Sequence, residues 1–176
     1  MIIWLTGRPC SGKTTLAHSV YAQLTMRGWD AHILDGDEIR MNLWPELTFT
    51  PIDRTKNVLR VAKLANLLTQ HHVTPIVSVV SPDRLIRDEV RRGSNGFIEV
   101  HVNAPYSVCA TRDVKGMYAK ASRGEILNFT GTLGGPAYEP PIDPEVECHT
   151  DVETIEDSTR KIILSIIEYK LRNRTA

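Results

Sequence analysis

Eight residues near the N-terminus have the types and spacing of a loop that binds the phosphates of a nucleotide. They are Gly7-Arg8-Pro9-Cys10-Ser11-Gly12-Lys13-Thr14, with Thr15 next. Two glycines allow the backbone to turn successive N–H groups toward an anion at a helix N-terminus. In such loops the lysine reaches the β- and γ-phosphates and the hydroxyl is a ligand of Mg²⁺. This segment, the phosphate loop below, therefore predicts binding of a nucleoside triphosphate.

An ordinary glycine turn is the alternative for this stretch. The flanking sequence favours the phosphate loop, because the apolar run of residues 2–5 precedes it and a segment with helical spacing follows. The apolar positions of that segment are Leu16, Ala17, Val20, Tyr21 and Leu24. The order strand, glycine loop and helix is the setting that the motif requires.

Two carboxylates, Asp35 and Asp37, follow a second apolar run at residues 31–34. If the chain is still extended there, both side chains point to the same side. We predict that Asp35 holds Mg²⁺ through water together with Thr14, and that Asp37 accepts a proton from an attacking hydroxyl. The alternative is that Asp37 only caps a helix that begins at Glu38.

Several cations could bind anionic groups near these carboxylates. Arg40 lies one helical turn beyond Asp37, and Arg54 shares a predicted helix face with Asn57. These residues could hold an anionic acceptor, although unconnected arginines are more often surface residues.

A basic stretch at residues 112–123 precedes a Gly- and Pro-rich stretch at 128–144. Its cations are Arg112, Lys115, Lys120 and Arg123. We predict a mobile lid at about 112–137, with Lys115 beside Gly116 as the cation that closes over the γ-phosphate. A solvated helix face is the alternative.

The elements that must position these residues alternate between strands and helices. Strands are expected at 2–5, 31–34, 74–80, 97–102 and 145–149. Helices are expected after the phosphate loop, at 38–43, from 51 with Thr50 as N-cap, from Ser81 to about 92, from 105 to 110, and after Thr154. This order predicts a three-layer α/β/α fold with a mostly parallel sheet. Ligands bind at the carboxyl ends of such strands, so the predicted site residues should share one crevice.

Composition limits the classes of function. The 176 residues suit one domain spanning 1–176, and 21 basic and 21 acidic residues give zero net charge, which argues against nucleic acid as a partner. No apolar run reaches membrane-spanning length, so no membrane partner is expected. Cys10, Cys109 and Cys148 form no paired motif, which argues against a zinc site and favours a reducing cytoplasm.

Further motifs follow the phosphate loop in a fixed order. They are Leu34-Asp35-Gly36-Asp37 with Arg40, Asp53-Arg54 with Asn57, Val80-Ser81-Pro82, Arg112-Asp113 with Lys115-Gly116 and Tyr118, Asn128-Phe129-Thr130-Gly131, and Tyr138-Glu139 with Pro141. Over nearly the whole chain, this order resembles the adenylylsulfate kinase family. The resemblance implies a phosphate-loop NTPase-type fold with a helical lid. It also implies transfer of the γ-phosphate of ATP, with Mg²⁺, to the 3′-hydroxyl of adenosine 5′-phosphosulfate. The sequence does not give the oligomeric state, and a homodimer is one candidate.

The resemblance also implies roles for single residues. Phe49 and Phe129 would stack on the adenine of the acceptor, and base stacking is worth roughly 1 to 3 kcal/mol. Arg40, Arg54 and Asn57 would hold its phosphosulfate and sugar, the backbone of Val80-Ser81 would border the pocket, and Arg112 would contact ATP. Ser81 matches a position described as phosphorylated. Because no base is evident beside it, we favour Ser81 as a helix cap and pocket wall over a nucleophile.

The sequence departs from the family pattern at several positions. They are Arg8-Pro9-Cys10, Lys56, Leu59, Asp83 and Gly134-Gly135. All except the first lie near the expected acceptor pocket. A related kinase of another small nucleotide and an ATP-binding module without catalysis therefore remain as alternatives.

Overall fold

A computed structural model describes residues 1–126, 128–130 and 136–173. Within them, five strands form one sheet in the order β2-β3-β1-β4-β5, and every neighbouring pair is parallel. The strands are β1 (Ile2–Thr6), β2 (Ala31–Asp35), β3 (Thr74–Ser78), β4 (Phe97–Asn103) and β5 (Val146–His149). The predicted α/β fold is confirmed.

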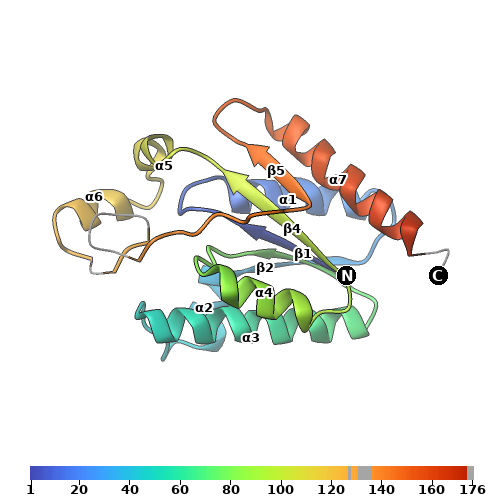
Figure 1. The fold of residues 1–176 in the computed structure, drawn as a ribbon, viewed down its shortest axis with the longest axis horizontal. Helices are drawn as coiled ribbons and strands as arrows, with labels where there is room; N and C mark the ends of the chain where they lie inside the picture. Colours follow the sequence, from blue (N-terminus) through green and yellow to red (C-terminus); the bar gives the residue numbers. More distant parts are fainter. Residues whose placement is uncertain (127, 131–135, 174–176) are drawn as a thin grey trace.

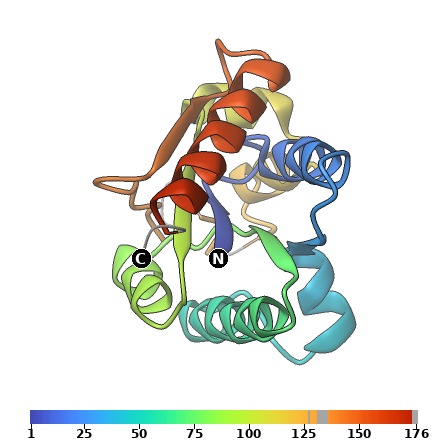
Figure 2. The same ribbon diagram turned by 90° about the vertical axis from the view of Figure 1, so that its right-hand side faces the viewer.

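Helices cover both faces of the sheet (Figures 1 and 2). The helices α1 (Lys13–Thr25) and α7 (Ile155–Arg172) pack together on one face. The other face carries α2 (Gly36–Leu43), α3 (Pro51–Gln70) and α4 (Arg84–Arg92). Two short helices, α5 (Tyr106–Arg112) and α6 (Met117–Ser122), lie beyond the carboxyl ends of the strands in Figure 1.

The central strand β1 separates two hydrophobic clusters because its side chains alternate between the faces. Ile3 and Leu5 pack into the cluster that contains α1 and α7, and Ile2 and Trp4 pack into the cluster that contains α3 and α4. All four side chains have no exposed surface. This buried strand holds the phosphate loop at its carboxyl end on a rigid base.

The first residues of α2, α3 and α7 test the N-caps predicted from local sequence. The Thr50 and Thr154 side chains accept hydrogen bonds from the backbone N–H of Asp53 and Asp157, so both predicted N-caps are confirmed. The cap of α2 is Asp35, whose Oδ1 accepts from the N–H groups of Asp37 and Glu38 at 3.0 and 3.4 Å. The alternative that Asp37 forms this cap is therefore wrong.

The prediction that Ser81 caps the next helix is also wrong. Helix α4 begins at Arg84, and the Asp83 side chain caps it by accepting from the Ile86 N–H at 3.2 Å. Strand β3 ends at Ser78 and leaves residues 79–83 to make the turn. Ser81 lies in that turn with φ 37°, and its hydroxyl is directed into the protein.

The predicted lid at about 112–137 is only partly described. The helix α6 falls within it, whereas residues 127 and 131–135, with Gly134-Gly135, lie outside the described residues. The lid and the single domain remain predictions. Among the described residues, no helix is long and apolar enough to cross a membrane.

Candidate active site

The phosphate loop connects β1 to α1 through a tightly constrained backbone. Gly12, the N-cap of α1, has φ 101°, a conformation that favours glycine. Gly7 is instead extended at φ 158°, and a Cβ there would lie 2.4 Å from the Val102 carbonyl oxygen. Gly7 is therefore required for space and Gly12 for backbone conformation. Cys10 also has a positive φ of 60°, which its residue type did not predict.

Lys13 lies folded under this loop. Its Nζ donates to the carbonyl oxygens of Gly7 at 3.0 Å and Arg8 at 2.8 Å, and the residue is only 8% exposed. Burial lowers the pKa of Lys13 to about 8, while nearby groups, Asp37 foremost, act in the opposite direction. The ammonium therefore lies beside the loop, and with a pKa of about 8 it begins to lose its proton just above neutral pH.

Two side chains brace the outside of the phosphate loop. Thr150, just after β5, donates from Oγ1 to the Ser11 carbonyl at 2.7 Å. Arg112 at the end of α5 donates to the Thr150 carbonyl at 2.5 Å and approaches the carbonyl groups of Cys10 and Ser11 at 3.5 Å. The resemblance placed Arg112 near ATP, but Thr150 was not predicted. Thr150 follows β5, and only the pairing of β5 with β4 in the sheet brings it to the phosphate loop.

Three oxygen-bearing side chains meet at the first turn of α1. Thr14 Oγ1 donates to Asp35 Oδ2 at 3.0 Å and lies 3.4 Å from Ser78 Oγ. Hydroxyl and carboxylate oxygens are the ligands that Mg²⁺ prefers, so these residues fit the predicted metal. Ser78 was missed in the sequence, because its contact follows from β3 lying between β1 and β2 in the sheet.

The two residues predicted to act on the transferred group contact each other. Lys115 Nζ donates to Asp37 Oδ2 at 2.8 Å, and both side chains are more than 60% exposed. This hydrogen bond raises the pKa of Lys115 above its ordinary value. Gly116 follows with φ 65°, which lets the chain turn into α6.

On the acceptor side, Arg54 joins the segments that carry the two predicted stacking rings. Its Nε donates to the Phe49 carbonyl at 3.0 Å, and its terminal nitrogens contact the Asn128 carbonyl and Thr130 Oγ1. The guanidinium carbon of Arg40 lies 4.6 Å from the centre of the Phe49 ring. Burial lowers the pKa of Arg54, and the nearby Arg40 charge adds to this effect.

The two rings have different surroundings. Phe49 is 50% exposed, whereas Phe129 is 6% exposed and packs edge-on against Tyr118 with ring centres 4.9 Å apart. Asn57 is 4% exposed, and its Oδ1 has no hydrogen-bond partner within the described part of the chain. Its position is compatible with the predicted contact to a ligand.

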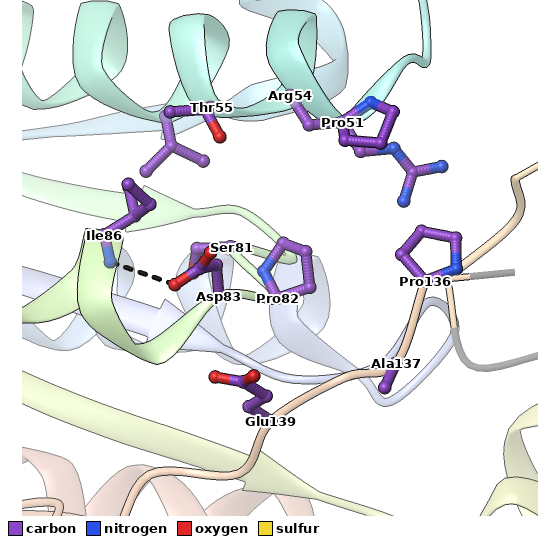
Figure 3. Close-up of a pocket in the computed structure, with 11 residues that line it drawn as sticks. Pro51, Arg54, Thr55, Ser81, Pro82, Asp83, Ile86, Pro136, Ala137 and Glu139 are labelled. Atoms are coloured by element: carbon purple, nitrogen blue, oxygen red, sulfur yellow. Dashed lines mark hydrogen bonds between the residues drawn. The ribbon is translucent and has the colours of Figure 1, made fainter.

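A pocket of about 240 Å³ opens next to these residues (Figure 3). Pro51, Arg54 and Thr55 of α3 form one side, and the turn at 81–83 forms another. Pro136, Ala137 and Glu139 form the third. The structure thus places the predicted residues Arg54 and Ser81 at one pocket.

Ser81 is a pocket residue whose hydroxyl is already engaged inside the protein. Its Oγ accepts from Trp4 Nε1 at 3.1 Å and donates to Thr6 Oγ1 at 3.1 Å, and the residue is 3% exposed. Neither partner is a base, so this geometry gives no support to a nucleophilic role.

Among those departures from the family pattern that the structure describes, only Asp83 lines this pocket. Lys56 is exposed and lies 3.6 Å from Asp53 Oδ1, and Leu59 packs against the α3–α4 core cluster. Asp83 is engaged in capping α4, as described above.

Sheet order, phosphate loop, oxygen cluster and neighbouring pocket together define a phosphoryl-transfer enzyme of the phosphate-loop class. Comparison with known proteins identifies its family. The family model for adenylylsulphate kinase matches residues 1–149. The adenylyl-sulfate kinase of Rippkaea orientalis is 51% identical over 160 residues, which cover 91% of this chain and 87% of that protein.

Solved structures agree with this finding. The APS kinase CysC of Mycobacterium tuberculosis, in complex with AMPPNP and APS, is 33% identical and superimposes with a TM-score of 0.88 over 94% of this chain and 96% of its own. The hexameric APS kinase from Thiobacillus denitrificans is 26% identical with a TM-score of 0.69, over 95% of this chain and 28% of its own. The chain belongs to the adenylylsulphate kinase family. It is an ATP-dependent kinase of adenosine 5′-phosphosulfate.

The lowered pKa of Lys13 predicts opposite effects of pH on activity and stability. As pH rises through about 8, the free enzyme loses the ammonium that meets the phosphates, so kcat/KM for ATP should fall. Between pH 8 and about 10.4 the unfolded chain holds more protons at this lysine, so its contribution to the free energy of unfolding should rise. Denaturation profiles of wild type and Lys13→Ala isolate that contribution. A parallel fall of activity and of the Lys13 contribution to stability would contradict this assignment.

Proposed function

We propose that this chain transfers the γ-phosphate of ATP in line to the 3′-hydroxyl of adenosine 5′-phosphosulfate, with Asp37 as the acceptor of the hydroxyl proton. The continuity of the site supports this most directly. Asp35 contacts Thr14 of the phosphate loop, and Asp37 follows two residues later at the start of α2. Arg40 of the same helix contacts Phe49, which also contacts Arg54 at the pocket.

In the donor half, the backbone N–H groups of the phosphate loop and Thr15 would bind the phosphates, except at Pro9, which has no N–H. Lys13 would turn from the loop carbonyls to the β- and γ-phosphates. Arg112 and Thr150 would hold the loop in shape from outside. Thr14 and Asp35 would hold Mg²⁺, with Ser78 beside them. When bound, Mg²⁺ would neutralise charge on the phosphates.

In the acceptor half, the pocket would take the phosphosulfate end of the acceptor, with Arg54 and Arg40 as counter-charges and Asn57 as a polar contact. Phe49 and Phe129 would flank the adenine. The backbone of Val80-Ser81 would form the wall. Lys115 would leave Asp37 for the transferring phosphoryl group, which frees the carboxylate to accept the proton.

We also propose a cytoplasmic enzyme that assembles as a homodimer. Three free cysteines support a reducing compartment. The relative from Thiobacillus denitrificans is hexameric, which supports assembly of this chain into an oligomer.

A ring introduced into the pocket tests the acceptor assignment. Thr55 lines the pocket from α3, so Thr55→Phe should occupy part of its volume and raise KM for adenosine 5′-phosphosulfate by about tenfold. KM for ATP should stay within about twofold, because the phosphate loop is unchanged. Lys56→Phe is the matched control, since it adds the same ring at an exposed position one residue later. Equal acceptor KM values in the two variants would show that the acceptor does not bind in this pocket.

A further inference from the structure

A buried arginine lies behind the acceptor pocket. Arg87 of α4 is 1% exposed, and its guanidinium makes three hydrogen bonds. Nε donates to Glu99 Oε1 at 2.8 Å, and the two terminal nitrogens donate to the carbonyl oxygens of Ser81 at 2.6 Å and Glu139 at 2.7 Å. One arm of the guanidinium is thus held by a carboxylate, while the other two reach backbone groups.

Both of those backbone groups belong to residues that line the pocket. Ser81 and Glu139 are 58 positions apart in the chain and approach the pocket from different segments (Figure 3). A bond from the Glu139 N–H to the Pro82 carbonyl at 3.0 Å and one from the Arg84 N–H to Glu139 Oε2 at 3.0 Å join the same segments. The Arg84 side chain also donates to the Pro140 carbonyl at 3.0 and 3.2 Å. Arg87 is the buried cation of this junction, and its planar guanidinium bonds the carbonyls of two pocket residues at once.

Ser81 needs such support because of its backbone. Its φ of 37° is unusual for a residue with a side chain, and conformations of this kind persist only where surrounding contacts fix them. Trp4 and Thr6 fix the hydroxyl, and Arg87 fixes the carbonyl.

Glu99 of β4 supplies the negative charge that pairs with Arg87. Glu99 is 6% exposed, and its second oxygen accepts from Arg91 at 3.2 Å. Arg91 is the next arginine along the same face of α4, and it also contacts Glu145. Arg91 therefore shares the carboxylate with Arg87, but none of its hydrogen bonds to the described residues goes to a pocket residue.

We infer that Arg87 is a positioning residue for the acceptor, because it holds the carbonyl groups of Ser81 and Glu139 and so fixes the spacing of two pocket walls. The inference rests on the proposed assignment of this pocket to adenosine 5′-phosphosulfate. It assigns Arg87 no contact with either substrate. Its loss should therefore affect binding of the acceptor and leave binding of the donor unchanged.

Arg87→Lys tests this role, because lysine keeps the charge beside Glu99 and cannot reach both carbonyls from one planar group. We expect KM for adenosine 5′-phosphosulfate to rise about tenfold, with KM for ATP within about twofold of wild type. Arg91→Lys is the matched control and should leave both constants unchanged. Circular dichroism at the assay temperature shows whether each variant is folded. If Arg87→Lys is unfolded, the same constants are measured for Glu99→Gln. This variant should also raise the acceptor KM, by a smaller factor, and an unchanged acceptor KM would overturn the inference.

The outcomes distinguish the role of Arg87 from the assignment of the pocket. A selective rise in acceptor KM for Arg87→Lys, absent in Arg91→Lys, supports the inference. Equal changes in both substrate constants, or equal behaviour of the two arginine variants, overturn it. If Thr55→Phe also leaves the acceptor KM unchanged, the assignment of the pocket fails; if Thr55→Phe raises it and Arg87→Lys does not, only the role of Arg87 fails.

Discussion

Replacing Lys13 with alanine should lower kcat by about 10²- to 10³-fold or more, below the detection limit of a coupled assay for ADP release. Lys13 is the buried cation of the phosphate loop, positioned by two carbonyl oxygens before any phosphate arrives. Removal of a preorganised charge at a transferring phosphoryl group costs about 3 to 4 kcal/mol in activation free energy. The variant also loses the side chain that braces Gly7 and Arg8, so ATP affinity should fall with it.

Lys63→Ala provides the control for this variant. Lys63 is an exposed lysine on α3, and its removal changes the net charge by the same amount without touching the loop. We expect its kcat to stay within about twofold of wild type, as for most surface substitutions. Near-normal turnover by a folded Lys13→Ala variant would show that residues 7–14 are not the donor site.

Asp37→Asn should lower kcat by about 10²- to 10⁴-fold with little change in KM for ATP, because the amide has a similar shape and cannot accept the hydroxyl proton. Asp37 is 63% exposed and paired with Lys115, so the substitution removes no core contact. Stability should therefore stay close to that of wild type. Steady-state kinetics with each substrate varied in turn separates the two constants.

The neighbouring carboxylate offers a matched comparison for Asp37. Glu38 is also exposed in the first turn of α2, and we expect Glu38→Gln to keep kcat within about twofold. If Asp37→Asn and Glu38→Gln lose activity equally, a general effect of charge at this helix start explains the loss. In that case Asp37 is not the proton acceptor.

The sequence predicted those features that depend on neighbouring residues. Strand, phosphate loop and helix are contiguous at residues 2–25, and the caps at Thr50 and Thr154 each lie three residues before the N–H that they bind. Local spacing is sufficient for such elements. The alternation of strands and helices then restricted the fold to a parallel sheet with two covered faces.

The error at Ser81 shows where local spacing is insufficient. Ser81-Pro82-Asp83 contains two residues that can cap a helix, and propensity ranks them nearly equal. The choice depends on Trp4, whose buried indole N–H needs an acceptor and finds the Ser81 hydroxyl. That contact spans 77 positions, so no local pattern contains it.

The residues missed in the site share the same reason. Ser78 reaches Thr14 and Thr150 reaches Ser11 through the order of the strands in the sheet. Arg87 reaches Ser81 only six positions away, but its bond to Glu139 spans 52 positions, and no local pattern contains that contact. By contrast, Asp35 and Asp37 were predicted because a short motif contains both. Their separate surroundings, one at Thr14 and the other at Lys115, match the division of roles that we propose.

Identification of the phosphorylated product tests the central proposal most directly. The enzyme is incubated with ATP labelled on the γ-phosphate, Mg²⁺ and either adenosine 5′-phosphosulfate or its 3′-deoxy analogue, and the products are separated. We predict one labelled 3′-phosphorylated product per ADP formed with the natural acceptor and no label transfer to the 3′-deoxy analogue. Label transfer to the analogue, or ADP release that does not depend on the acceptor, would contradict transfer to the 3′-hydroxyl at this site.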